Sequence, residues 1–289
     1  MGNLESKGEF LSGSIGITIL KKDKRVIVVF ADAHSNVTYC KNNSKKVSNW
    51  IGNRIDGNNI LIEEVPRSEN IHLNDLWQTE HVQELKDLYL KNSDKITGTD
   101  LRPYLKDFSY DLINIDKEIG KTNLKDYLEK LRLFFISKNI NCNNIINNLF
   151  KQKVEKNTGL RFHFEYLKKE FNKFYEKLKN DNLLEKDLNF INKNNKDIFN
   201  DIDFYLDSII EWYTLCKIFT TNNLTIIHTG LYHSINIIKF LEKFYKFDIK
   251  YNNGIVDKLP SNLENLSSCV YIPQNIKDKY IGKNKYIIF

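Results

Sequence analysis

Residues 224–244, LTIIHTGLYHSINIIKFLEKF, decide the fold class of this chain. The first part, as far as Gly230, is rich in β-branched residues and predicts a buried strand. After the glycine, apolar residues recur at helical spacing and predict an amphipathic helix over 232–246. Strands that alternate with helices in this way are typical of α/β proteins. Two of the six histidines in the chain, His228 and His233, lie on either side of the glycine.

The N-terminal part of the chain predicts further strands. Residues 13–20 and 25–30 are β-rich runs separated by the charged turn KKDK, which together predict a hairpin. The polar stretch 36–53 has spaced apolar positions and predicts a helix, and 58–66 predicts a short buried strand that a proline ends. The second strand of the hairpin, this helix and this strand therefore form a compact βαβ unit.

The middle of the chain is mainly helical in pattern. A helix is predicted at 79–91, and a loop is predicted at 96–105 because glycine and proline punctuate it. Apolar residues with a period of 3.6 predict several helices between about 121 and 219. The polar stretch 180–197 within that block is interpreted as a mobile loop.

The C-terminal part returns to short β-like runs, at 247–252, 268–273 and 285–289. Alternating strands and helices favour an α/β fold with a mixed, partly parallel sheet flanked by helices. We therefore expect a single α/β domain over 1–289, with a helical insertion or subdomain at 121–222 in the middle of the chain.

The composition argues against several classes of protein. With 41% hydrophobic residues over 289 positions, the chain is long enough for a sizeable core. The net charge of +6 is spread along the whole length, so it predicts a solvated surface rather than a nucleic-acid interface. The sequence contains no run of about 18 apolar residues, so no membrane-spanning helix is predicted.

The four cysteines are far apart and form no C-x-x-C pair: Cys40, Cys142, Cys216 and Cys269. This spacing predicts neither a disulfide framework nor a zinc knuckle, and it favours a reducing compartment. Lys, Asn and Ile are abundant while Pro and Gly are scarce, which indicates AT-rich coding of a large DNA virus or a protist. We therefore expect a cytoplasmic protein, in the host cytoplasm if the source is viral.

The N-terminus carries a lipidation pattern. Removal of Met1 exposes Gly2, and Ser6 stands where the M-G-x-x-x-[ST] pattern of N-myristoylation requires Ser or Thr, with Lys7 next to it. A single myristoyl chain gives only marginal membrane binding, so the pattern predicts a reversible, peripheral membrane contact.

Ionisable residues follow three of the predicted strands: Asp32, His34, Glu63, Glu64, His228 and His233. In a parallel sheet the carboxyl ends of strands meet at one rim, where ligands bind in α/β folds. Imidazoles and carboxylates at such a rim suit Zn, Mn, Co or Fe(II), and without a metal they suit general acid–base catalysis. The strand ends therefore predict a metal or catalytic site.

Each of these residues also has a structural interpretation. His34 could cap the turn that follows its strand, and His228 could be a core histidine at the end of an apolar strand. Glu63 and Glu64 point to opposite sides of their strand, so at most one of them faces the site. We rank His233, on the first turn of the helix, above His228 as the functional histidine.

Other ionisable residues are weaker candidates. Arg67 lies close to the glutamate pair and could orient a carboxylate or bind an anionic substrate. Asp100 and Arg102 lie in a loop bounded by glycine and proline, either as functional groups or as a pair that holds the loop. The remaining histidines are interpreted as structural or surface residues: His72, His81 and His163.

Three segments follow one another along the chain: ADAHS, ILIEEVPR and GLYHS. In this order they resemble the motifs of the TraB/Tiki-like superfamily, which includes distant relatives around erythromycin esterase and the ChaN proteins. Those families carry G-x-x-H after the first strand, a glutamate with a nearby arginine, and a second G-x-x-H. Here Glu63 with Arg67 matches the glutamate motif, with Glu64 as the alternative register. His233 completes an intact second G-x-x-H, whereas Ala31 replaces the glycine of the first.

The resemblance implies a metal-dependent hydrolase, protease- or esterase-like, in which His34, Glu63 and His233 hold a divalent metal (Mn, Co or Zn) and act on a peptide or small-molecule substrate. The chain is also similar to uncharacterised proteins of large DNA viruses.

Two alternative functions stay open. The D-x-H of Asp32 and His34 resembles the first motif of calcineurin-like metallophosphoesterases, although the other motifs of that family are missing. The altered Ala31 suits an inactive, myristoylated viral accessory protein that binds a host partner.

Overall fold

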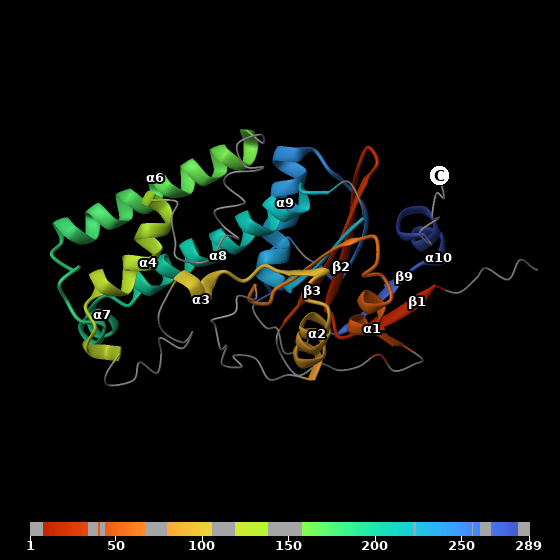
Figure 1. Ribbon diagram of the computed structural model, residues 1–289, viewed down its shortest axis with the longest axis horizontal. Helices are drawn as coiled ribbons and strands as arrows, with labels where there is room; N and C mark the ends of the chain where they lie inside the picture. The colour runs from red at the N-terminus through yellow and green to blue at the C-terminus, as the bar shows by residue number, and fades with distance from the viewer. Residues whose placement is uncertain are drawn as a thin grey trace, which may run out of the picture. The chain divides into compact units, whose positions relative to one another are not determined.

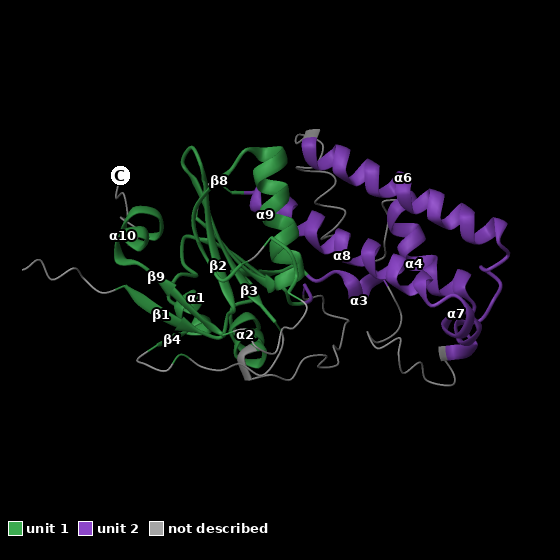
Figure 2. Cartoon of the chain, turned by 180° about the vertical axis from the view of Figure 1, so that it is seen from behind, with its two compact units in different colours: residues 1–64, 77–99, 221–289 green, residues 65–76, 100–220 purple. Residues whose placement is uncertain are grey.

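The computed structural model describes residues 8–33, 40, 44–66, 80–105, 119–137, 158–221, 224–255, 257–260 and 267–282. The chain forms two compact units (Figure 2). Unit 1 comprises 1–64, 77–99 and 221–289, and unit 2 comprises 65–76 and 100–220. The helical unit 2 thus begins earlier in the chain than the predicted insertion at 121–222.

Unit 1 is built on a six-stranded sheet with the order β6-β5-β7-β3-β2-β8. Figure 1 labels two of its strands, β2 and β3. Its strands are β2 (Gly16–Lys22), β3 (Arg25–Asp32), β5 (Asn59–Ile62), β6 (Ile96–Gly98), β7 (Thr225–Gly230) and β8 (Asp248–Asn253). The four strands β6, β5, β7 and β3 run parallel, while β2 and β8 pair antiparallel. The predicted α/β fold with a mixed, partly parallel sheet is therefore confirmed.

A second, three-stranded sheet in unit 1 has the order β4-β1-β9, from β1 (Glu9–Ser12), β4 (Lys45–Lys46) and β9 (Cys269–Ile272). The helices of unit 1 are α1 (Val47–Gly52), α2 (Glu80–Lys91), α9 (Leu231–Tyr245), α10 (Gln274–Ile276) and the π-helical turn η4 (Lys277–Ile281). The predicted strand at 268–273 is thus real but belongs to this second sheet. The predicted strand at 285–289 lies outside the described residues. Of the predicted helix at 36–53, residues 36–39 and 41–43 lie outside them, and α1 forms only the last part, after β4.

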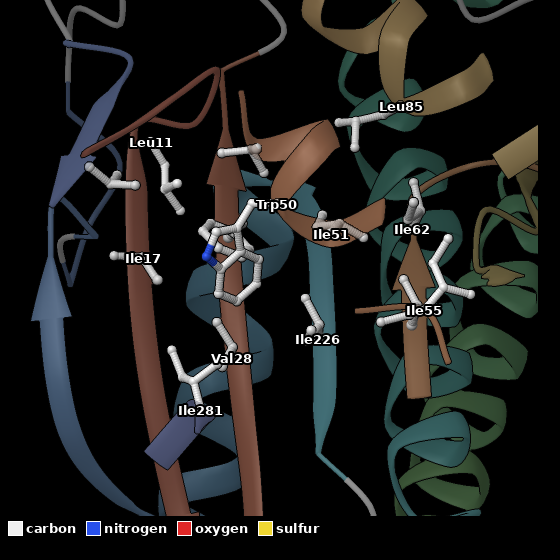
Figure 3. Close-up of a cluster of buried hydrophobic side chains, with 14 of the residues drawn as sticks. Leu11, Ile17, Val28, Trp50, Ile51, Ile55, Ile62, Leu85, Ile226 and Ile281 are labelled. Atoms are coloured by element: carbon white, nitrogen blue, oxygen red, sulfur yellow. The ribbon is translucent and has the colours of Figure 1, made fainter. Parts of the chain in front are cut away.

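A hydrophobic core of unit 1 lies between the sheet and α1. Val28 and Phe30 of β3 and Ile226 of β7 point to the same face, since alternate residues of a strand share a side. Trp50 of α1 covers them, and its indole meets the Phe30 ring edge-on at 5.2 Å between centroids. Figure 3 shows α1 in front of these strands and α9 behind them. Helices on both faces are what bury a parallel sheet.

One predicted loop is partly a strand. Residues 96–105 contain β6, which pairs with β5 in parallel, and the short helix α3 (Arg102–Leu105). The glycine and proline that predicted a loop are present, but they lie at the end of β6 and inside the first turn of α3. Pairing with β5 satisfies the backbone of a strand that is too short to show a periodic pattern.

The expectation of no disulfide is wrong. Cys40 and Cys269 are joined, with their Cα atoms 5.0 Å apart and a separation of 229 positions in sequence. The bond ties the segment that follows β3 to β9. Cys216 is a free, buried cysteine in unit 2, and Cys142 lies outside the described residues. A disulfide of this kind is typical of oxidising compartments, so it removes the cysteine argument for a reducing one.

Unit 2 is helical in its described part. Its elements are α3, η2 (Ile119–Lys121), α4 (Leu124–Ser137), α6 (Thr158–Asn180), α7 (Leu188–Asn194) and α8 (Asp197–Ile218). Buried aromatic rings of α4, α6 and α8 form its core: Phe134, Phe135, Phe164, Phe171 and Trp212. The stretch 180–197, predicted as a loop, contains α7. Asp187 caps the first turn of this helix, because its side chain accepts a hydrogen bond from the Phe190 N–H. Of the helices in the described ranges, none is long and apolar enough to span a membrane.

Candidate functional site

The carboxyl ends of three parallel strands meet at one edge of the six-stranded sheet. In the register of β3 and β7, Asp32 lies beside Gly230, and in that of β5 and β7, Ile62 lies beside His228. Glu63 follows Ile62 directly, so it leaves β5 next to the end of β7. We call this edge the rim. Three of the predicted site residues lie outside the described residues: Gly2, His34 and Arg67.

The carboxylate of Glu63 is held by the end of β7. Its Oε2 accepts hydrogen bonds from the Thr229 hydroxyl at 2.7 Å and from the Gly230 main-chain N–H at 2.6 Å. The main-chain N–H of Glu63 donates in turn to the carbonyl of His228 at 3.0 Å. Gly230 is the N-cap of α9, and an anion is favourable at the positive end of a helix. Glu63 is therefore fixed in position and also caps the helix that carries His233.

The remaining oxygen of Glu63 faces His233. His233 Nε2 lies 3.6 Å from Glu63 Oε1, and each side chain is 6% exposed. The Tyr232 ring packs against the imidazole at nearly a right angle. A carboxylate and an imidazole at this separation, largely withdrawn from water, interact more strongly than they would at an exposed surface. The pair suits proton transfer or the ligation of a metal.

His228 has a different environment. Its Nε2 lies 3.3 Å from the Ser14 hydroxyl, and both residues are buried. On β7 it shares the face of Ile226, which packs beneath α1, because the two are separated by one residue. The imidazole is therefore part of the packed interior, in agreement with its structural interpretation from the sequence.

Asp32 and Glu64 also lie close to the rim. Asp32 is buried at the end of β3, and its Oδ1 accepts a hydrogen bond from the Ala33 N–H at 2.8 Å. Glu64 turns away from the strand direction, since its main-chain N–H donates to the carbonyl of Ile62 at 2.7 Å. Of the two adjacent glutamates, Glu63 is the one whose carboxylate contacts His233.

Arg102 belongs to unit 2 and is engaged by two carboxylates. Its Nε and Nη2 donate to the two oxygens of Asp100 at 2.9 and 3.0 Å, and its Nη1 donates to Asp207 of α8 at 3.2 Å. The Arg102 and Asp100 side chains are 12% and 9% exposed. A guanidinium fork occupied in this way holds α3 against α8. This geometry favours the structural interpretation of the pair over a functional one.

The rim offers a partial set of ligands for a metal. Two ligands bound at about 2.1 Å in tetrahedral geometry lie roughly 3.4 Å apart, which is close to the separation of Glu63 Oε1 and His233 Nε2. Within the described part of the chain, no group of three or more His, Cys, Asp or Glu side chains is arranged to hold a metal ion. His34, the third ligand that the family resemblance implies, lies outside that part.

Sequence reasoning missed the residues that position this pair. The hydroxyl of Thr229 and the N–H of Gly230 hold Glu63, and Ser14 contacts His228 from a loop more than two hundred residues away in sequence. Thr229 and Gly230 lie inside the HTGLYH motif, which is the signal that could have suggested them. Ser14 has no comparable signal, because only the folded sheet brings it to β7.

Comparisons of the chain with protein-family models, with curated proteins and with solved structures give no match. The resemblance to the TraB/Tiki-like superfamily therefore stays a prediction that rests on three short motifs of the sequence.

Proposed function

We propose that the chain is a hydrolase of the type implied by the TraB/Tiki-like motifs, with Glu63 and His233 as its central residues. It acts on an ester or peptide bond and uses a divalent metal. The observation that carries the proposal is the contact of 3.6 Å between Glu63 Oε1 and His233 Nε2 at the carboxyl ends of parallel strands. That location is where α/β folds place their ligands.

The two side chains have complementary roles in this reaction. His233 takes a proton from a water molecule, whose oxygen adds to the carbonyl carbon of the substrate. The imidazolium then returns the proton to the departing alkoxide or amine as the C–O or C–N bond breaks. Glu63 keeps the imidazole in place and stabilises its positive charge. Because Thr229 and Gly230 hold the other oxygen of Glu63, this arrangement exists before substrate binds.

A divalent metal at the rim would polarise the attacking water or the substrate carbonyl. Glu63 Oε1 and His233 Nε2 would supply two of its ligands, and the family resemblance implies His34 as the third. With a metal bound in this way, the ion would activate the water in place of His233, and the proton transfers described above would belong to the metal-free pair. Carboxylate oxygens and imidazole nitrogens are ligands for Zn, Mn and Co alike, so the proposal names the ligand set and not the ion.

The competing explanation is that Glu63 only caps α9. The capping contacts are made by Oε2 alone, whereas Oε1 faces the imidazole. Alanine at Glu63 would remove both roles and would also leave two buried donors without an acceptor. Glutamine is the better substitution, because it keeps the shape and an oxygen acceptor while removing the charge.

The test measures hydrolysis of p-nitrophenyl esters, fluorogenic peptides and p-nitrophenyl phosphates, in EDTA and with added Mn²⁺, Co²⁺ or Zn²⁺. The wild type is expected to cleave an ester or peptide in a metal-dependent way. Glu63→Gln and His233→Gln should each lower kcat/KM by about 100-fold or more, the range of a lost general base. Glu64→Gln is the matched control and should keep the wild-type rate. Folded Glu63→Gln and His233→Gln proteins with wild-type kcat/KM would overturn the proposal.

Asp32 favours one alternative function, since it is buried at the same rim. A metallophosphoesterase that uses Asp32 and His34 would turn over the phosphate esters in the same panel, and Asp32→Asn would abolish that turnover. A wild type that cleaves no substrate and binds no metal would instead favour a catalytically inactive accessory protein. Such a protein would contact membranes through a myristoylated Gly2 and bind a host protein, and mass spectrometry after co-expression with a myristoyltransferase tests the lipid.

A further inference from the structure

A hollow of about 830 Å³ lies in unit 1 at the end of the sheet opposite to the rim. Asn58 and Leu224 line it, and they directly precede β5 and β7, so they mark the amino ends of these strands. The other walls come from the end of α1 and from the C-terminal segment 274–282. The volume falls within the range of pockets that bind small molecules.

Arg54, just beyond the end of α1, lines this hollow. Its guanidinium lies over the indole of Trp50, with Cζ 3.8 Å from the ring centroid, and its Nη1 donates to the Trp50 carbonyl at 2.9 Å. Partial burial lowers the pKa of Arg54, because it removes some of the water around the charge, and Glu9 opposes that effect. One hydrogen bond uses only a part of the donor fork of an arginine, so most of its N–H groups remain for a ligand.

The carboxylate of Glu9, whose charge acts on Arg54, is engaged by other donors. It accepts hydrogen bonds from Trp50 Nε1 at 2.7 Å and from Lys45 at 3.3 Å, and it forms an ion pair with Lys277 at 3.0 Å. The side chain of Glu9 is 11% exposed. Lys45 and Lys277 also line the hollow, so three cations contribute to its walls.

The two acidic residues of the walls have partners of their own. Asp56 pairs with Lys95 at 2.8 Å, and Asp278 accepts a hydrogen bond from Gln274 at 2.6 Å. Arg54 differs from them, because in the described part of the chain its guanidinium donates only to a carbonyl and forms no ion pair. A half-buried guanidinium fork that lines a cavity is the kind of group that recognises carboxylates and phosphates.

We propose that this hollow binds a small molecule that carries an oxyanion, a phosphate or a carboxylate, and that Arg54 holds that oxyanion. The apolar side chains of Ile55 and Ile281, which are buried in the walls, would pack against the body of the ligand. The stacked Trp50 keeps the guanidinium plane in one orientation, which lowers the entropy lost when the ligand binds. The site is separate from the rim and does not depend on the hydrolase proposal.

Isothermal titration calorimetry of the full chain tests this assignment with three probes: inorganic phosphate, AMP and succinate. The wild type is expected to bind at least one of them at concentrations up to about 10 mM, some ten times a millimolar dissociation constant. Binding of AMP but not of inorganic phosphate would indicate that the apolar walls contribute to the affinity. Binding of succinate alone would indicate a carboxylate ligand.

Substitutions of Arg54 then decide whether it is the binding group. Arg54→Gln should weaken binding by about ten-fold or more, since it removes charge-assisted hydrogen bonds. Arg54→Lys should weaken it less, because lysine keeps the charge and loses the fork. The matched control is Arg132→Gln in unit 2, where Arg132 is paired with Glu129 at 2.8 Å, and it should not change the dissociation constant.

Glu9→Gln gives a test in the opposite direction. It removes a negative charge that acts on Arg54 and should therefore tighten binding of the same probe. The assignment is overturned if the wild type binds none of the three probes, or if folded Arg54→Gln and Arg54→Lys bind with the wild-type affinity. Should Arg54→Gln unfold, Arg54→Lys and Glu9→Gln still decide the question.

Discussion

Glu63 is expected to stabilise unit 1 in addition to forming the site. Its Oε2 accepts two hydrogen bonds and lies at the N-terminus of α9. A hydrogen bond to a charged group contributes about 1.5–3 kcal/mol, and an anion at a helix N-terminus about 0.3–1 kcal/mol. Glu63→Gln keeps one acceptor oxygen, so we expect it to lower the free energy of unfolding by about 1–2 kcal/mol. Glu63→Ala leaves the buried Thr229 hydroxyl and Gly230 N–H unsatisfied, so we expect it to lower the free energy of unfolding by about 3–5 kcal/mol.

Hydrogen exchange of the Gly230 amide is the most local assay for this effect. A loss of 1–2 kcal/mol corresponds to exchange that is roughly 5–30 times faster from the folded state. Urea denaturation of the same variants measures the loss over the whole of unit 1. Glu64→Gln is the control and should change neither quantity by more than about 0.5 kcal/mol. A stabilising role of Glu63 is refuted if the Gly230 amide exchanges at the wild-type rate in Glu63→Gln while Glu63→Ala lowers the free energy of unfolding by less than about 1 kcal/mol.

Three further predictions concern groups away from the rim. Burial lowers the pKa of His163 to about 4 from 6.5, so the folded unit 2 takes up the proton less readily than the unfolded chain. Its stability should be unaffected by this group above pH 6.5 and fall by up to about 3 kcal/mol between pH 6.5 and 4, and His163→Gln should remove that part of the slope in urea denaturation. Reduction of the disulfide should lower the free energy of unfolding by about 2–4 kcal/mol. Peptide mapping without reductant should recover a peptide with Cys40 linked to one with Cys269. Burial also raises the pKa of the Cys216 thiol, so iodoacetamide should modify this residue only after the protein is unfolded.

The sheet could be predicted from the sequence because its strands carry strong local patterns. The β-branched runs of β3 and β7 and the direct passage of β7 into α9 are readable without a structure. β6 could not be recognised, because its three residues show no period and its identity as a strand comes from pairing with β5. The Cys40–Cys269 bond was missed for a similar reason, since two cysteines 229 residues apart meet only once the two sheets have formed.

The candidate site was predicted in part. Strand ends in a parallel sheet converge by geometry, so Glu63 and His233 could be placed together before the fold was known. The choice of Glu63 over Glu64 and the burial of His228 against Ser14 required the actual register of the strands. The hydroxyl and main-chain donors that hold Glu63 could not be predicted, because they depend on the positions of single atoms at the start of α9.

A double-mutant cycle on Glu63 and His233 tests most directly whether the two residues form one catalytic unit. Kcat/KM is measured for the wild type, Glu63→Gln, His233→Gln and the double variant, with the substrate that the wild type cleaves best. Residues that act as a unit are strongly non-additive, so we predict that the double variant is no slower than the slower single variant. Losses that multiply in the double variant would contradict the account, because each residue would then contribute independently of the other.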